Sequence, residues 1–223
     1  MSPLRHILFD NDGTIVDSEI IAVRVMLRHL AGMGLHLSER DYSQRFPGLL
    51  ERDIVAILAR EHAIRFPDDF LLQMREEHIE AFKSELRAIP GMTSLFRRLR
   101  VPKSMVSNGS VRHVERSLRR VRLRHALDGH IFSAEHVERP KPHPDVYELA
   151  LHRLQLQPAD VVVVEDSPTG VAAAKAAGLR VVGFLGAAHV QDGHAEKLLD
   201  HGADLLAADA RALGRLLESW GAF

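Results

Sequence analysis

The chain has 223 residues, and its 29 lysines and arginines nearly balance its 30 acidic residues, which leaves a formal net charge of −1. A nearly neutral chain has no bulk electrostatic attraction for nucleic acid or for an anionic membrane, so we expect neither as a partner. The absence of cysteine excludes disulfides, thiolate nucleophiles and cysteine-based zinc sites. The apolar runs are too short to cross a bilayer and no signal peptide precedes the first of them, which predicts a cytoplasmic protein.

The predicted strands are five short apolar runs, at residues 6–10, 103–107, 130–133, 161–165 and 180–184. The clearest of them contains four consecutive valines, as expected for a strand that is covered on both faces. Helical patterns lie between the runs, and one of them has typical start and stop signals in Ser167-Pro168 and Gly178. This alternation of strands and helices predicts an α/β fold, a parallel sheet with helices on both faces.

One long segment interrupts the alternation. From residue 18 to about residue 86 the apolar residues recur with helical spacing, and no run is typical of a strand. Pro90-Gly91 then marks the return of the alternating pattern. The simplest interpretation is an insert of four or five helices at residues 17–87, placed after the first strand of a core formed by residues 1–16 and 88–223.

Polar residues follow the ends of several predicted strands. Asp10 and Asp12 come directly after the first strand, and side chains two residues apart on an extended segment point the same way. Such a pair can divide labour, since one carboxylate can be a nucleophile or metal ligand while the other carries a proton. Ligands bind open parallel sheets at the carboxyl ends of the strands, so we expect one shared site there. Its other candidates are Ser107, Asn108, Gly109, Lys141, Glu165 and Asp166.

Each of these groups also has a simpler interpretation as a turn, a solvated loop or a helix cap. An EF-hand calcium loop is excluded, because the twelfth position counted from Asp10 is Ile21 and not glutamate. The arginine-rich stretch at residues 119–124 lacks interleaved aromatic residues, so it is interpreted as a solvated helix face. A single site at one sheet edge accounts for all the polar groups at once.

Four segments of the chain resemble, in order, the motifs of the haloacid dehalogenase-like hydrolase superfamily. They are Phe9-Asp10-Asn11-Asp12-Gly13-Thr14, Val106-Ser107-Asn108-Gly109, Lys141-Pro142-His143-Pro144-Asp145 and Val164-Glu165-Asp166-Ser167. The resemblance implies a Rossmann-like core with a helical cap after the first strand. Within the superfamily the chain is similar to the sugar-phosphate phosphatases and β-phosphoglucomutases. Two short segments, residues 45–48 and 82–86, are most similar to bacterial 6-phosphogluconate phosphatases.

The resemblance implies an Mg²⁺-dependent phosphatase that acts on a small phosphorylated metabolite. Asp10 matches the nucleophile, which forms an aspartyl-phosphate. Asp12 matches the general acid/base, which protonates the leaving alkoxide and then deprotonates the hydrolytic water. Asp10, the main-chain carbonyl of Asp12 and Asp166 match the Mg²⁺ ligands, whereas Glu165 matches either a further ligand or a group behind the ligands.

The same resemblance assigns the phosphoryl group to Ser107 and to the amides near Asn108 and Gly109, with Lys141 neutralising its charge. In the insert, the candidates for reading a second anionic group of the substrate are Arg45, Gly48 and Arg52. Arginine suits carboxylates and phosphates, although a surface role for each arginine is the simpler interpretation.

Several other functions share this core. A phosphomutase would pass the aspartyl-phosphate to a second hydroxyl, and Thr14 weakly favours the phosphatase over it. A dehalogenase needs neither a metal nor a proton donor, which would leave Asp12 and Asp166 unexplained. A non-catalytic phospho-metabolite sensor of the receiver type would lack the large insert, and the full set of acids argues against an inactive sensor but leaves a slow one open. We expect a phosphatase for sugar phosphates or phosphogluconate, and a monomer.

Overall fold

The computed structural model describes residues 4–46, 49 and 51–223. The chain divides into two compact units. The first, called the core unit here, comprises Met1–Asp17 and Arg87–Phe223, and the second, called the insert unit, comprises Ser18–Leu86. In the part of the chain that the structure describes, no helix combines the length and the apolar character that crossing a membrane requires.

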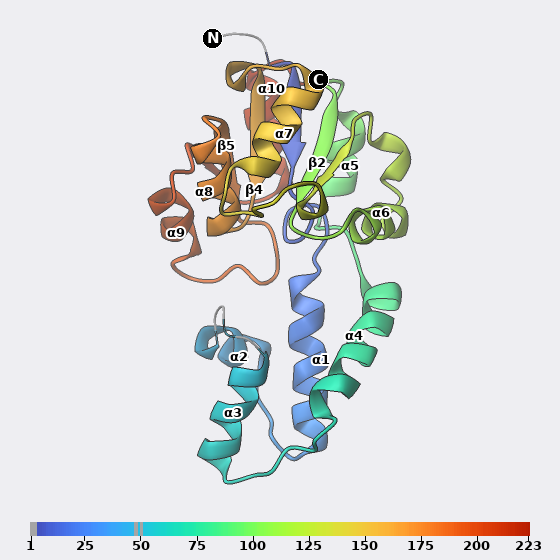
Figure 1. Cartoon of the computed structure of the whole chain (residues 1–223), viewed down its shortest axis with the longest axis vertical. Helices are drawn as coiled ribbons and strands as arrows, with labels where there is room; N and C mark the ends of the chain where they lie inside the picture. The colour runs from blue at the N-terminus through green and yellow to red at the C-terminus, as the bar shows by residue number, and fades with distance from the viewer. Residues whose placement is uncertain (1–3, 47–48, 50) are drawn as a thin grey trace. The chain divides into compact units, whose positions relative to one another are not determined.

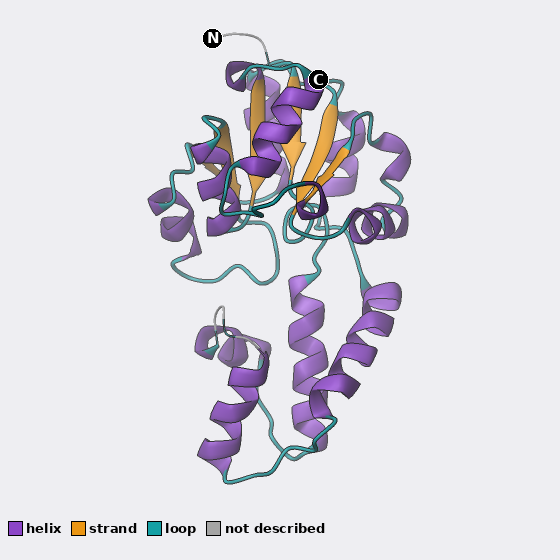
Figure 2. Cartoon of the chain, in the orientation of Figure 1, coloured by secondary structure: helices purple, strands orange, loops and turns teal. Residues whose placement is uncertain are grey.

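The core unit is built on a parallel sheet of six strands in the order β3-β2-β1-β4-β5-β6 (Figure 2). Their bounds are His6–Phe9 (β1), Lys103–Ser107 (β2), Ile131–Ser133 (β3), Val161–Glu165 (β4), Arg180–Phe184 (β5) and Leu205–Ala207 (β6). Phe9 lies opposite Met105 of β2 on one side and Val164 of β4 on the other. The first strand is therefore central, and the predicted α/β, Rossmann-like parallel sheet is confirmed.

The sixth strand is absent from the sequence prediction. β6 has three residues and lies at the edge of the sheet, where it pairs only with β5. Leu205 is exposed and the strand has only three residues, so β6 lacks the longer apolar run that marks a strand buried on both faces.

Helices cover both faces of the sheet (Figures 1 and 2). Leu8 belongs to a buried cluster with Tyr147 of α7, whereas the ring centroid of Phe9 lies 5.2 Å from that of Phe96 in α5. Successive strand residues face opposite sides, so α7 and α5 lie on opposite faces. The core helices are α5 (Met92–Arg98), α6 (Val111–Arg120), α7 (Asp145–Leu154), α8 (Pro168–Ala176), α9 (His194–Asp200) and α10 (Ala210–Ser219).

The insert unit is helical in all its described elements: α1 (Glu19–Gly32), α2 (Glu39–Arg45), α3 (Glu51–His62) and α4 (Phe70–Glu85). α1 packs along α4 (Figure 1), and Glu77 of α4 binds Arg28 and His29 of α1 at 2.6 and 2.8 Å. Ser38 caps α2 by accepting a hydrogen bond from the Asp41 N–H at 3.0 Å. These contacts hold α1 against α4 and stabilise the start of α2 within the insert unit.

A buried histidine makes the stability of the core unit sensitive to acid. His6 lies on β1 with its Nε2 atom 2.9 Å from the Ser104 hydroxyl, and burial lowers the pKa of His6 to about 4. Between pH 6.5 and 4 the unfolded chain binds a proton that the folded chain excludes, so the free energy of unfolding falls as the pH falls. We expect His6→Gln to weaken this dependence by up to about 1.4 kcal/mol per pH unit.

The measurement is urea unfolding at pH 7 and pH 5. His201→Gln is the control, because His201 is exposed and its Nδ1 atom lies 2.8 Å from the Lys197 carbonyl, one helical turn earlier in the chain. If the free energy of unfolding depends on pH equally in the wild type and in His6→Gln, His6 is not the acid-sensitive group.

Candidate active site

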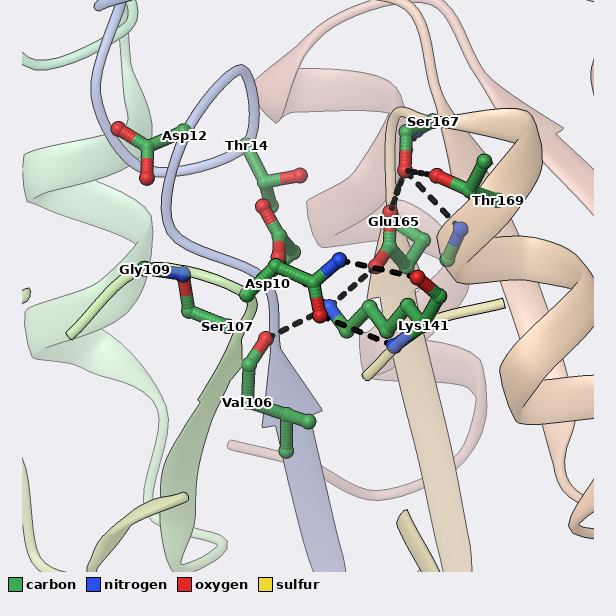
Figure 3. A network of polar contacts seen from close by, with 12 residues as sticks. Asp10, Asp12, Thr14, Val106, Ser107, Gly109, Lys141, Glu165, Ser167 and Thr169 are labelled. Carbon is green, nitrogen blue, oxygen red and sulfur yellow. Dashed lines mark hydrogen bonds and ion pairs between the residues drawn. The ribbon is translucent and has the colours of Figure 1, made fainter. Parts of the chain in front are cut away.

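A lysine between two carboxylates forms the centre of the site, at the carboxyl end of the sheet (Figure 3). Asp10 directly follows β1, Glu165 is the last residue of β4, and Lys141 lies in the loop before α7. The Lys141 ammonium donates to Asp10 Oδ1 at 2.7 Å, to Glu165 Oε1 at 2.6 Å and to the Val106 carbonyl at 2.8 Å. The three charged side chains are buried, so their interactions are only weakly screened by solvent.

The buried site holds more acidic groups than one lysine can balance. Carboxylate oxygens of Asp10, Glu165 and Asp166 all lie within 4.8 Å of one another. Burial raises the pKa of Asp10 to about 8 against the pull of Lys141, and burial raises the pKa of Asp166 well above its ordinary value. Burial alone would lower the pKa of Lys141, but Asp10 and Glu165 outweigh it and hold that pKa well above its ordinary range. A divalent cation would offset the surplus negative charge.

The donor atoms around this cluster suit a hard divalent cation, since all are oxygens. Gly13 has a φ of +79°, and a Cβ atom there would lie 1.8 Å from Asp166 Oδ2, so only glycine lets the loop approach Asp166. The Thr14 hydroxyl donates to Asp166 Oδ1 at 3.1 Å and orients the carboxylate. The site therefore fits a metal held by Asp10 and Asp166.

Glu165 is already saturated with hydrogen bonds. Its Oε1 atom accepts from Lys141 and, at 3.1 Å, from the Tyr147 hydroxyl, while Oε2 accepts from the Ser167 N–H and hydroxyl at 3.1 and 3.0 Å. A Cβ atom on Gly170 would lie 1.8 Å from Oε1, so glycine is required to leave room for this carboxylate. Each oxygen thus accepts two hydrogen bonds, which is its full lone-pair capacity.

The segment after β2 forms a second wall of the site. The Gly109 N–H donates to the Ser107 hydroxyl oxygen at 2.9 Å, and Ser107 is buried. The Asn108 side chain donates to the Lys141 carbonyl at 3.1 Å and accepts from the Lys141 N–H at 3.0 Å. This two-point contact shows that the Asn108 side chain holds the lysine segment in place.

Asp12 lies apart from the lysine cluster. Figure 3 shows its carboxylate pointing away from Asp10 and Lys141. The carboxylate oxygens of Asp12 lie 2.9 and 3.0 Å from Nε2 of His113, in the first turn of α6. The hydrogen bond to Asp12 raises the pKa of His113.

Sequence reasoning missed three histidines around the site. Besides His113, His189 places Nε2 3.3 Å from Asp166 Oδ2, and His194 Nε2 donates to the Asp166 carbonyl at 2.6 Å. Burial and His194 lower the pKa of His189 to about 4. The available signal was position: all three follow the carboxyl ends of β2 or β5, at the same sheet edge as the acids.

The predicted substrate-reading residues belong to the insert unit. Arg45 forms an ion pair with Glu61 and lies 5.0 Å from the centre of the Phe46 ring. The Arg52 side chain is 72% exposed and lies 3.5 Å from the Asp53 carboxylate. Gly48 lies outside the described residues, so substrate contact by these residues stays a prediction.

Comparisons with known proteins identify the family of the chain. The family model of the haloacid dehalogenase-like hydrolases matches residues 7–184. The 6-phosphogluconate phosphatase of Escherichia coli K12 is 29% identical over 195 residues, which cover 85% of this chain and 86% of that protein. The phosphorylated carbohydrates phosphatase of Thermotoga maritima is 31% identical over 220 residues, which cover 96% of this chain and 99% of that protein.

The structural comparison covers both units. A HAD family hydrolase from Deinococcus radiodurans R1, with bound phosphate and sodium, has a TM-score of 0.89 and 34% identity over 100% of this chain and 99% of its own. The residues that the family model matches run from β1 to β5 and include all four motif segments of the sequence. The chain therefore belongs to the haloacid dehalogenase-like hydrolases, and within them to the sugar-phosphate phosphatase subgroup.

Proposed function

We propose that this phosphoric monoester hydrolase removes phosphate from small phosphorylated carbohydrates, 6-phosphogluconate among them, in an Mg²⁺-dependent reaction through an aspartyl-phosphate on Asp10. The observation that carries the proposal is the buried contact of Asp10 with Lys141, beside Glu165 and Asp166. An aspartate held by a lysine at the edge of a parallel sheet is suited to attack an anionic phosphoryl group once charge is balanced. The relatives named as phosphatases support the substrate class.

Each acid of the cluster has a separate task in this proposal. Asp10, Asp166 and the Asp12 main-chain carbonyl would hold Mg²⁺, which would supply positive charge to neutralise the phosphoryl group. Glu165 has no lone pair left for a metal, so it holds the Lys141 ammonium against Asp10. Ser107 and nearby main-chain amides bind the phosphoryl oxygens.

The reaction then proceeds in two displacements. Asp10 attacks phosphorus, the bond from phosphorus to the leaving oxygen breaks, and Asp12 gives its proton to that oxygen. Asp12 next takes a proton from water, which attacks phosphorus and releases inorganic phosphate and the Asp10 carboxylate. Lys141 balances the charge at Asp10 in both displacements. The insert unit carries Arg45 and Arg52, the candidate residues for substrate selection.

The test is phosphate release from a panel that includes 6-phosphogluconate and β-glucose 1-phosphate. We expect release with Mg²⁺, loss of release with EDTA and recovery when Mg²⁺ is restored. Undiminished release in EDTA would contradict the metal requirement. Isomer conversion with a bisphosphate primer, in place of phosphate release, would identify a phosphomutase, and specific binding of a panel member without turnover would identify a sensor.

A further inference from the structure

The Asp12 carboxylate has its own partner, distinct from the lysine cluster. The Nε2 atom of His113 lies 2.9 Å from Asp12 Oδ1 and 3.0 Å from Oδ2. A donor that lies almost equally close to two carboxylate oxygens restrains the position of the carboxylate group. The contact joins the loop after β1 to the first turn of α6, so it connects two elements that flank the site.

The sequence around α6 builds the position of this imidazole. Ser110 caps the helix by accepting a hydrogen bond from the His113 N–H at 3.1 Å, which fixes the helix start directly after β2. A Cβ atom on Gly109 would lie 2.9 Å from Cδ2 of His113, so the missing side chain leaves space for the ring. Helix cap and glycine together direct His113 toward Asp12.

The two reactive acids have different basic partners among the described contacts. Lys141 contacts Asp10 and Glu165, whereas His113 contacts Asp12, whose carboxylate Figure 3 shows turned away from the lysine. His113 therefore contributes to the orientation of Asp12 through a contact that Lys141 does not make. A proton donor must be oriented toward the leaving oxygen as well as present, because misplacement by a fraction of the hydrogen-bond length weakens the transfer.

We infer that His113 is a positioning residue that orients the Asp12 carboxylate for proton transfer to the leaving group. The inference rests on the proposed function, in which Asp12 is the general acid/base. It implies that His113 matters most for substrates whose leaving group departs as an alkoxide and needs a proton. His113 matters little for substrates whose leaving group is stable without a proton.

The experiment compares leaving groups through kcat/KM, which reports the first displacement. The substrates are the best sugar phosphate of the panel, p-nitrophenyl phosphate and acetyl phosphate, and the variants are His113→Phe and His113→Gln. We expect His113→Phe to lose roughly 10- to 100-fold in kcat/KM on the sugar phosphate, which is less than the roughly 10²- to 10⁴-fold that general acid catalysis itself contributes, and less than about 3-fold on the two activated substrates. His113→Gln keeps an N–H donor and should recover part of the loss.

Two outcomes would overturn the inference. An equal loss on all three substrates would show a merely structural role, and His113→Gln no better than His113→Phe would show that the hydrogen bond is not what matters. His125→Phe is the control, since His125 is exposed in the turn after α6 and should leave all rates unchanged.

Asp12→Asn separates this inference from the proposed function. If Asp12→Asn is selectively slow on the sugar phosphate while His113→Phe is not, only the role of His113 is wrong. If Asp12→Asn affects every substrate equally in kcat/KM, the general-acid assignment itself fails. The comparison therefore tells the two failures apart.

Discussion

Asp10→Asn is expected to reduce phosphate release by roughly 10⁴-fold or more, the scale of loss when a covalent nucleophile is removed. The amide oxygen of asparagine is a poor nucleophile, and the amide carries no charge to attract a cation or the Lys141 ammonium. Asparagine is nearly isosteric with aspartate, so the substitution changes the charge beside Lys141, whose Nζ atom lies 2.7 Å from Asp10 Oδ1, without opening a cavity. The measurement is single-turnover phosphate release with the best substrate of the panel.

Asp128→Asn is the matched control for this variant. Asp128 also pairs with a lysine, Lys103 at 2.6 Å, but it is half exposed and lies at the other end of β2. We expect the turnover of the Asp128→Asn protein to stay close to that of the wild type. A thermal unfolding curve will show whether the Asp10→Asn protein is folded. If it is folded and its turnover is close to that of the wild type, Asp10 is not the nucleophile.

Lys141→Met is expected to impair both stability and turnover. The substitution leaves Asp10 and Glu165 buried and facing each other without a cation, and breaking such a buried pair costs about 3–5 kcal/mol. Loss of a charge that neutralises the transferring phosphoryl group should reduce kcat by roughly 10²- to 10³-fold. Urea unfolding and steady-state kinetics measure the two effects.

Mg²⁺ should recover part of the stability of Lys141→Met, because the ion replaces positive charge beside the same carboxylates. Lys175→Met is the control: Lys175 binds Asp204 at 2.8 Å, but both side chains are at least one-third exposed, so we expect a loss of less than about 1 kcal/mol. A Lys141→Met protein as stable as the Lys175→Met protein would show that the cluster is not held by its central ion pair.

The sheet was predictable because its central strands are buried on both faces and carry unmistakable apolar runs. Val161–Glu165 and Lys103–Ser107 have the bounds that the sequence predicts. β6 was not predictable in this way, since an edge strand of three residues with an exposed Leu205 gains its structure from pairing with β5. Strand prediction from apolar runs therefore depends on how fully each strand is covered.

The convergence of Asp10, Lys141, Glu165 and Asp166 was predictable for the same reason, since the carboxyl ends of parallel strands share one edge. Sequence reasoning could not distinguish a ligand from a supporting group at Glu165, because the difference is how many hydrogen bonds its oxygens accept. The histidines were missed because they lie on helices and loops, where no run of residues marks the direction of a side chain.

The order of the strands has a consequence for the synthesis of the chain. β1 emerges from the ribosome first, yet its two neighbours begin only at Lys103 and Val161. A nascent chain that ends before Val161 cannot complete the sheet around the strand that leads into Asp10, whereas residues 18–86 form one compact unit by themselves. The insert unit can therefore fold during translation, while the reactive centre is assembled only when most of the polypeptide has been made.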